Sequence, residues 1–168
     1  MRAEGAIAPR VFFAGPLLDG QHVVYDGQNR PLLGIANPDA ETARANVARL
    51  AASGVDFVKI YEMVTPEVFD ALVRAAEQRG LPIAAHVPLS MRARDVAARL
   101  NSMEHLRNVE MDCAAGADEL LAIRRRLLVE DPGEPGATLR ARLHSLQRLP
   151  AVAAYDAAVC DGALTAMA

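Results

Sequence analysis

Three side chains in the middle of the chain could bind a metal ion or react with a substrate. Lys59 stands in the stretch DFVKIY, His86 in LPIAAHV and His105 in SMEHL. Each lies at the end of a short apolar run that is typical of a buried strand, just before a loop. The carboxyl ends of parallel strands meet at one edge of a sheet, where such folds build their active sites. We therefore expect the three side chains to converge in space.

Lys59 is the sole lysine among the 18 lysine and arginine residues of the chain. Its retention in an arginine-biased sequence indicates that this position needs an amine, because a guanidinium stays protonated and is a poor nucleophile. Two reactions would use that amine. It could combine with carbon dioxide to form a carbamate, which binds metal as a carboxylate does. It could instead form a Schiff base with a carbonyl substrate, as in a lyase or aldolase.

The two histidines favour the metal site over the Schiff base. Neutral imidazoles are the commonest ligands of zinc and similar divalent ions. An unmodified ammonium group would repel such an ion, so Lys59 would join the site only as the carbamate. The Schiff-base hypothesis explains the lysine but does not account well for the two histidines. The sequence thus predicts a divalent ion, zinc by default, near Lys59, His86 and His105.

Strand-like and helix-like segments alternate over residues 1–112, which predicts parallel βα units. The predicted strands are 10–18, 55–61, 81–87 and 102–106. The predicted helices are 39–54, 65–80 and 90–101. Thr65 and Ser90 are the expected N-cap residues, and 19–38 is expected to be a long loop. Residues 113–168 are expected to be mostly helical, with breaks at 130–136 and at Pro150.

Bulk composition excludes several classes of protein. Hydrophobic residues make up 52% of the chain, charged residues 23%, and the net charge is -3, as in ordinary globular proteins. The arginines are scattered among acidic residues, which argues against a nucleic-acid-binding face. No apolar run reaches the ~18 residues of a membrane span, and the first residues do not form a signal peptide. A cytoplasmic location is the default expectation, and the compartment stays open. Cys113 and Cys160 are expected to be buried, unpaired side chains.

The ordered set GVDFVKIY, RGLPIAAHV and NSMEHL resembles the amidohydrolase superfamily, in particular its imidazolonepropionase-like and prolidase-like members. The resemblance implies a metal-dependent hydrolase of amide-type bonds, with a small-molecule or peptide-like substrate. It also implies that Lys59 is carboxylated and bridges two ions, and that His86 and His105 bind one of them. The stretch APRVFFAGPLLDGQHV resembles the family's third strand and the loop after it.

The resemblance covers the middle of the family's barrel. The His-x-His motif of the family's first strand has no counterpart here, nor has the aspartate of its eighth strand. A complete (β/α)₈ barrel also needs at least ~200 residues. The implied fold is therefore α/β, a partial (β/α)₈ TIM-type barrel over about strands 3 to 6 with a helical C-terminal segment. Residues 1–168 would form a single partial catalytic domain. We expect the isolated chain to be inactive, and a non-enzymatic truncated reading frame is a further alternative.

Four other polar residues lie near the three predicted site residues or on the predicted helices and loops. Tyr61 lies two residues after Lys59, so it should point to the same side of the strand, where it would either contact a substrate or pack in the core or rim. His22 could reach the mouth of the site, although a solvated loop position is the simpler interpretation. His144 is expected to be structural or exposed. Glu104 is expected to point away from His105, toward the covering helices.

Overall fold

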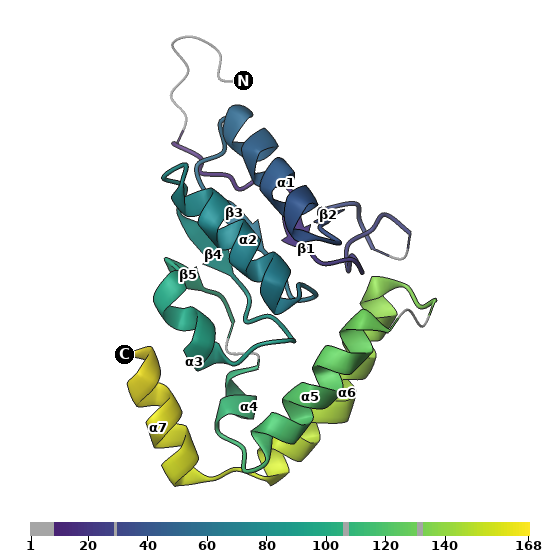
Figure 1. The fold of residues 1–168 in the computed structure, drawn as a ribbon, viewed down its shortest axis with the longest axis vertical. Helices are drawn as coiled ribbons and strands as arrows, with labels where there is room; N and C mark the ends of the chain where they lie inside the picture. The colour runs from purple at the N-terminus through teal and green to yellow at the C-terminus, as the bar shows by residue number, and fades with distance from the viewer. Residues whose placement is uncertain (1–8, 29, 106–107, 131–132) are drawn as a thin grey trace.

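A parallel sheet of five short strands forms the centre of the molecule (Figure 1). The computed structural model describes residues 9–168 except 29, 106–107 and 131–132. The strands are β1 (Leu17–Asp19), β2 (Gly34–Ala36), β3 (Val58–Ile60), β4 (Ile83–Ala85) and β5 (Ser102–Met103). Their order in the sheet is β2-β1-β3-β4-β5, and every pairing is parallel. Among the described residues β2 and β5 are the edges, so the predicted α/β class with parallel βα units is confirmed, whereas closure into a barrel is not shown.

The first two strands differ from the prediction. β1 begins after Gly15 and Pro16 rather than before them, and β2 lies inside the segment predicted as a loop. β2 has only three residues, GIA, and its neighbours are rich in glycine, asparagine and proline. No periodic pattern therefore predicts this strand. Two expectations rest partly on residues outside the described range, namely the absence of a signal peptide in 1–8 and the break at 130–136.

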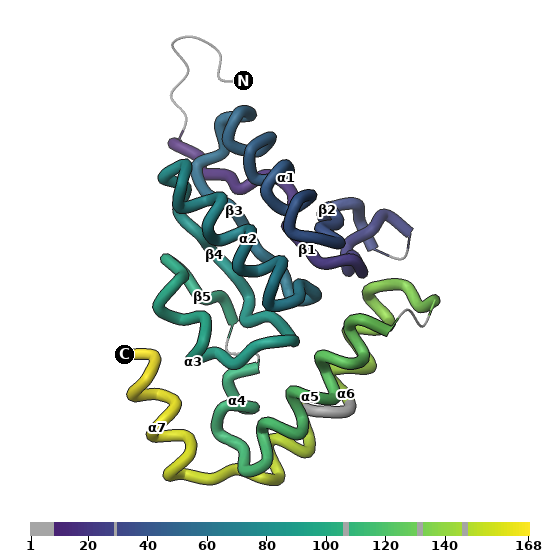
Figure 2. The backbone as a smooth tube through the Cα atoms, in the orientation of Figure 1, coloured from purple at the N-terminus to yellow at the C-terminus, as the bar shows by residue number. Residues whose placement is uncertain are grey.

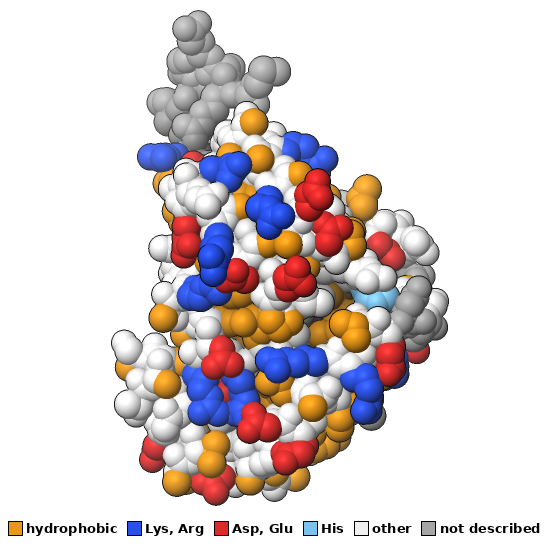
Figure 3. All heavy atoms as spheres, viewed as in Figure 1, with side chains coloured by type: hydrophobic (Ala, Val, Ile, Leu, Met, Phe, Trp, Pro, Cys, Tyr) orange, Lys and Arg blue, Asp and Glu red, His pale blue; other side chains and the backbone are white. Residues whose placement is uncertain are grey.

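The described residues also form seven α-helices and one 3₁₀ turn. They are α1 (Ala40–Ala52), α2 (Pro66–Glu77), α3 (Ala93–Val96), the 3₁₀ turn η1 (Ala97–Arg99), α4 (Val109–Asp112), α5 (Ala117–Val129), α6 (Gly136–Ala153) and α7 (Ala157–Met167). In the part of the chain that the structure describes, none of them is long and apolar enough to cross a lipid bilayer. On the face drawn in Figure 3, basic and acidic side chains are interspersed rather than gathered by sign.

α1 and α2 cover one face of the sheet (Figure 1). α2 begins as predicted, with the Thr65 Oγ1 atom accepting a hydrogen bond from the Val68 amide at 3.3 Å and Pro66 in the first turn. Its apolar side, including Phe69 and Leu72, is buried against Ile60 and its neighbours. Burying a side chain of this size stabilises the fold by roughly 1.5–3 kcal/mol, so this layer fixes the strands that carry the site.

Two predicted helix boundaries are wrong. Ser90 does not cap α3, because its hydroxyl donates to the Val64 carbonyl oxygen at 2.8 Å. The Asp112 carboxylate, from α4, accepts from the Ala93 amide at the start of α3 instead. Pro150 does not end α6, which continues to Ala153. A proline removes one amide donor, and near the end of a long helix the remaining hydrogen bonds can compensate for the missing one.

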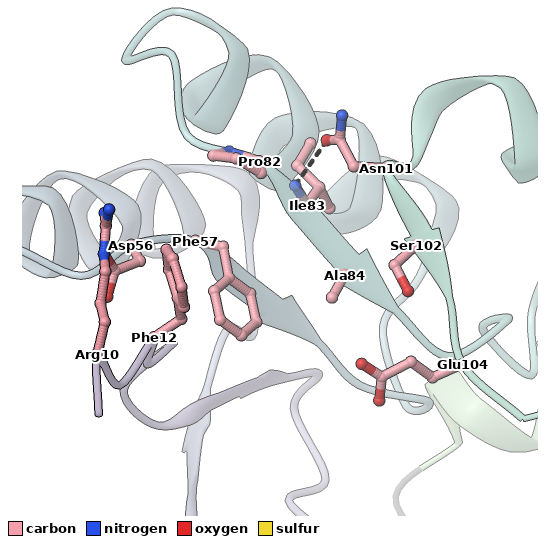
Figure 4. A pocket seen from close by; sticks show the side chains of 10 residues that line it. All are labelled: Arg10, Phe12, Asp56, Phe57, Pro82, Ile83, Ala84, Asn101, Ser102 and Glu104. Carbon is pink, nitrogen blue, oxygen red and sulfur yellow. Dashed lines mark hydrogen bonds and ion pairs between the residues drawn. The ribbon is translucent and has the colours of Figure 1, made fainter. Parts of the chain in front are cut away.

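The opposite side of the sheet is arranged differently. α5 and α6 lie side by side beyond the carboxyl ends of the strands (Figure 2). There Tyr61 and Leu89 pack against Leu139 and Leu143 of α6. Toward the amino ends lies an open pocket of about 450 Å³ (Figure 4). Ala84, Ser102 and Glu104 are among the side chains that line it.

Cys113 and Cys160 form a disulfide, with an S–S distance of 2.09 Å. The prediction that they form no disulfide is wrong, whereas Cys113 is buried as predicted. They lie 47 residues apart, and only the packing of α7 beside the end of α4 brings them together. The backbone joins the same two regions, since the Asp156 amide donates to the Cys113 carbonyl oxygen at 2.9 Å. Two cysteines at such spacing give no pattern from which the pairing could have been read.

Asp19, at the end of β1, holds three backbone segments together. Its carboxylate accepts hydrogen bonds from the amides of Gly20 at 3.1 Å, Val24 at 2.9 Å and Met63 at 2.9 Å. The side chain is fully buried, and burial raises its pKa to about 7 although the three amides oppose that rise. Asp19 therefore fixes the turn after β1 against the segment after β3.

We expect the stability that depends on Asp19 to fall as the pH rises from about 4 to 7. The folded protein keeps this proton up to about pH 7, whereas the unfolded chain loses it near the ordinary pKa of 3.8. Between these values the folded state binds more protons, so the free energy of unfolding declines with pH by up to ~1.4 kcal/mol per pH unit. Urea unfolding of the wild type and Asp19→Asn at several pH values measures this slope. A difference between the two proteins that stays constant with pH would contradict the prediction.

Candidate metal centre

His86, Glu104 and His105 gather at the carboxyl edge of the sheet. Each offers one ligand atom, and these atoms lie within 4.8 Å of one another. The two imidazole rings are nearly perpendicular, with their centroids 4.7 Å apart. His86 is buried, Glu104 is partly buried and His105 is exposed. The group is thus anchored on the protein side and open on the solvent side.

Strand register explains how His86 and Glu104 meet. Lys59 of β3 pairs with Ala84 of β4, and Ala84 pairs with Ser102 of β5. Side chains two residues apart on a strand point to the same face, so His86 follows Ala84 and Glu104 follows Ser102 on that face. Figure 4 shows Ala84, Ser102 and Glu104 lining the same pocket.

The prediction that Glu104 points away from the site is wrong. It assumed that strand alternation continues through His105, which would put the two side chains on opposite faces. β5 ends at Met103, and His105 has a positive φ of 62°. This left-handed conformation is uncommon for a residue other than glycine, and it breaks the alternation. The turn at His105 therefore brings its ring to the same side as Glu104.

Lys59 joins the group through Glu104. Its Nζ atom donates to the Glu104 carboxylate, and its side chain is 9% exposed. This contact with Lys59 holds the pKa of Glu104 below its ordinary value. The Glu104 carboxylate is therefore ionised at neutral pH and can offer an oxygen atom as a metal ligand. The structure thus brings together the three side chains that the sequence singled out, with Glu104 between Lys59 and the histidines.

Tyr61 and His22, the two predicted substrate contacts, occupy different surroundings. Tyr61 lies on the same side as Lys59, and its ring centroid is 4.6 Å from that of His86. It is buried among apolar side chains, and burial raises its pKa, so the phenol stays neutral. His22 is half-buried in the segment between β1 and β2, where its backbone lies against Gly136. It is not one of the side chains that gather around His86.

Glu62 is a central residue of the site that sequence reasoning missed. It is fully buried, and its Oε1 atom lies 2.6 Å from His86 Nδ1. Arg140 of α6 donates to it from Nε at 2.6 Å and from Nη2 at 2.9 Å, and His144 Nε2 lies 3.0 Å from its Oε2 atom. Burial alone would raise the pKa of Glu62, but hydrogen bonds from His144, His86 and Arg140 outweigh it and hold the pKa far below its ordinary value.

A weak signal for Glu62 is present in the sequence. An acidic residue stands between apolar neighbours in KIYEMV, and Arg140 and His144 are four residues apart on a helix, which places them on one face. His144 was expected to be structural or exposed, and the structure gives it a structural contact. The pairing itself spans 78 and 82 positions, so no local pattern connects the partners.

The donor set fits a divalent transition metal. Two imidazoles and one carboxylate, with an open position, are a ligand combination found in catalytic zinc sites. The exposed side of the group, at His105, would leave room for water or substrate. Lys59 offsets the negative charge of Glu104, so the metal-free group does not gather charges of one sign.

Comparisons with known proteins show a likeness of fold. No family model and no curated protein matches the sequence. Among solved structures, the chain is similar to a bottromycin amidohydrolase, with 19% sequence identity and a TM-score of 0.51. The likeness covers 96% of this chain and 52% of that protein, so the chain spans about half of the other protein's length. At this identity the likeness shows the fold alone, an α/β arrangement that an amidohydrolase also uses.

Proposed function

We propose that this chain supplies metal-binding residues of a hydrolase that acts on amide-type carbon–nitrogen bonds of small, peptide-like molecules. The observation that carries the proposal is the meeting of His86, Glu104 and His105 at the carboxyl edge of a parallel sheet. The likeness of fold to an amidohydrolase supports the reaction class. The order of the motifs around Lys59, His86 and His105 supports the same class.

A divalent ion in such a site lowers the pKa of a bound water and polarises the carbonyl of the substrate. His86 and His105 would hold the ion with nitrogen donors, and Glu104 with a carboxylate oxygen. Tyr61 packs beside the His86 ring and limits its rotation. The buried side chains under His86 keep water away from that side of the site, while the exposed His105 marks the side from which a substrate can enter.

Lys59 can serve this site in one of two forms. As an ammonium it balances the charge of Glu104, which is the contact that the structure contains. As a carbamate it would bridge two ions, as the family resemblance implies. A carbamate next to the Glu104 carboxylate would place two anions together, so that form requires a cation between them. The same ion pair favours the hydrolase over a Schiff-base lyase, because the pair stabilises the protonated amine.

Zinc content and amide hydrolysis test the proposal together. We expect the purified chain to retain about one zinc ion per molecule after dialysis, and to lose it to a strong chelator. Hydrolysis of dipeptides and N-acylated amino acids would then be measured on this chain and on the longest product of its gene. We expect chelator-sensitive hydrolysis from a product that also contains the His-x-His motif and the aspartate that the family resemblance implies. A chain that binds no zinc, cobalt or manganese would overturn the proposal, and borohydride trapping of a carbonyl compound on Lys59 would favour the lyase.

A further inference from the structure

We propose that Glu62 is a positioning residue that fixes the His86 ring so that its Nε2 atom is the metal-binding atom. This inference rests on the proposed metal site and adds a residue to it that no ligand motif contains. Glu62 touches neither substrate nor metal in this proposal. Its role is to orient His86 and to connect that orientation to α6.

The contact between Glu62 and His86 selects one tautomer of the imidazole. An ionised carboxylate has no hydrogen to donate, so the hydrogen bond of 2.6 Å requires that Nδ1 carry the hydrogen. In the neutral ring the lone pair then lies on Nε2. A hydrogen bond from the second ring nitrogen to a carboxylate is a common way in which proteins orient a histidine ligand and raise its basicity.

The carboxylate of Glu62 is itself held from several directions. Arg140 donates two hydrogen bonds and His144 lies 3.0 Å away, so neither oxygen can turn without losing a partner. The positive charge of Arg140 offsets the buried negative charge, which would otherwise be costly. Glu62 is therefore a rigid acceptor for His86.

The His86 ring is also confined by its aromatic neighbours. Tyr61 packs on it at 4.6 Å between centroids, and the Arg140 guanidinium lies 5.7 Å from the centroid of the Tyr61 ring. Arg140 thus contacts both groups that hold His86, namely Glu62 and Tyr61. A displacement of α6 would loosen the two contacts at once, which makes the orientation of His86 depend on the docking of this helix.

The test compares Zn²⁺ binding by the wild type and by Glu62→Gln, measured in the full chain by competition with a chelating dye. Glutamine keeps the size of the side chain, but its amide nitrogen cannot accept from Arg140 or His144. We expect Zn²⁺ affinity to fall ~10–100-fold, the range found when partners of metal-bound histidines are removed. Glu110→Gln is the matched control, since Glu110 is partly buried and lies 3.9 Å from Arg148. We expect that control to bind Zn²⁺ within about twofold of the wild type.

A second measurement needs no substitution of Glu62. Nitrogen-15 NMR of the metal-free wild type should show His86 with its hydrogen on Nδ1, assigned by comparison with His86→Gln. Hydrogen on Nε2 would overturn the inference, even if Glu62→Gln does not fold. Equal or tighter Zn²⁺ binding by Glu62→Gln would also overturn it, because Glu62 would then compete with the metal for His86. A wild type that binds no Zn²⁺ but has the expected tautomer would instead defeat the proposed function and leave the orienting contact standing.

Discussion

Replacing His86 by alanine should weaken Zn²⁺ binding by about 100-fold or more. Zinc-finger peptides bind their structural zinc with apparent free energies of about 10–16 kcal/mol. Divided among the four ligands of such a site, this is roughly 3 kcal/mol for each ligand, and 1.4 kcal/mol corresponds to a factor of ten in affinity. His105→Ala should have a similar effect, because its ring completes the same group. Glu104→Gln should weaken binding to a lesser degree, since an amide oxygen can still coordinate but carries no charge. Titration of Co²⁺ and Zn²⁺, followed by visible absorption and by dye competition, measures all three.

His22→Ala is the matched control for the histidine variants, since His22 does not belong to the group around His86. We expect it to bind Zn²⁺ as the wild type does. Lys59→Arg separates the two forms of Lys59, because arginine keeps the charge but cannot become a carbamate. Unchanged affinity in Lys59→Arg assigns Lys59 to charge balance beside Glu104. A loss as large as that of His86→Ala, together with a dependence on bicarbonate in the wild type, assigns it to the carbamate. Affinities of His86→Ala and His105→Ala within threefold of the wild type would contradict the proposed site.

The elements under the site could be predicted because their signals are local. α2 has an N-cap threonine, a proline in its first turn and an apolar stripe, all within a dozen residues. β3 and β4 are short apolar runs next to loops, which is enough to place Lys59 and His86 at one edge of a parallel sheet. Local patterns therefore predicted which residues would meet there.

The detail of the site depends on features that local patterns do not contain. The side on which Glu104 lies follows from the left-handed backbone at His105, and strand alternation cannot foresee such a turn. Glu62 is defined by partners from α6, far along the chain, and the disulfide between Cys113 and Cys160 depends on how two helices pack. These are contacts of the folded chain, so they become visible only when the packing of α4, α6 and α7 is known.

Arg140→Leu should destabilise the protein by about 3–5 kcal/mol, the usual cost of removing one partner of a buried ion pair. The side chain of Glu62 is 0% exposed and that of Arg140 is 16% exposed, so water would replace little of the lost interaction. Urea unfolding at neutral pH, followed by circular dichroism, measures the change. Arg142→Leu is a matched control two residues away on α6, because its ion pair with Glu134 is 3.3 Å long and about one-third exposed on both sides. An exposed pair of this kind contributes at most ~1 kcal/mol.

The double variant Glu62→Leu with Arg140→Leu distinguishes loss of the pair from loss of a packed side chain. If the main cost of Arg140→Leu is an uncompensated buried carboxylate, removing that carboxylate as well should recover part of the stability, and a double-mutant cycle should give a coupling of at least ~2 kcal/mol. A cost for Arg140→Leu no larger than that for Arg142→Leu would show that Leu139 and Leu143 alone dock α6. The expected result instead makes one buried carboxylate responsible both for docking α6 and for orienting His86, so Arg140→Leu should lower stability and Zn²⁺ affinity together.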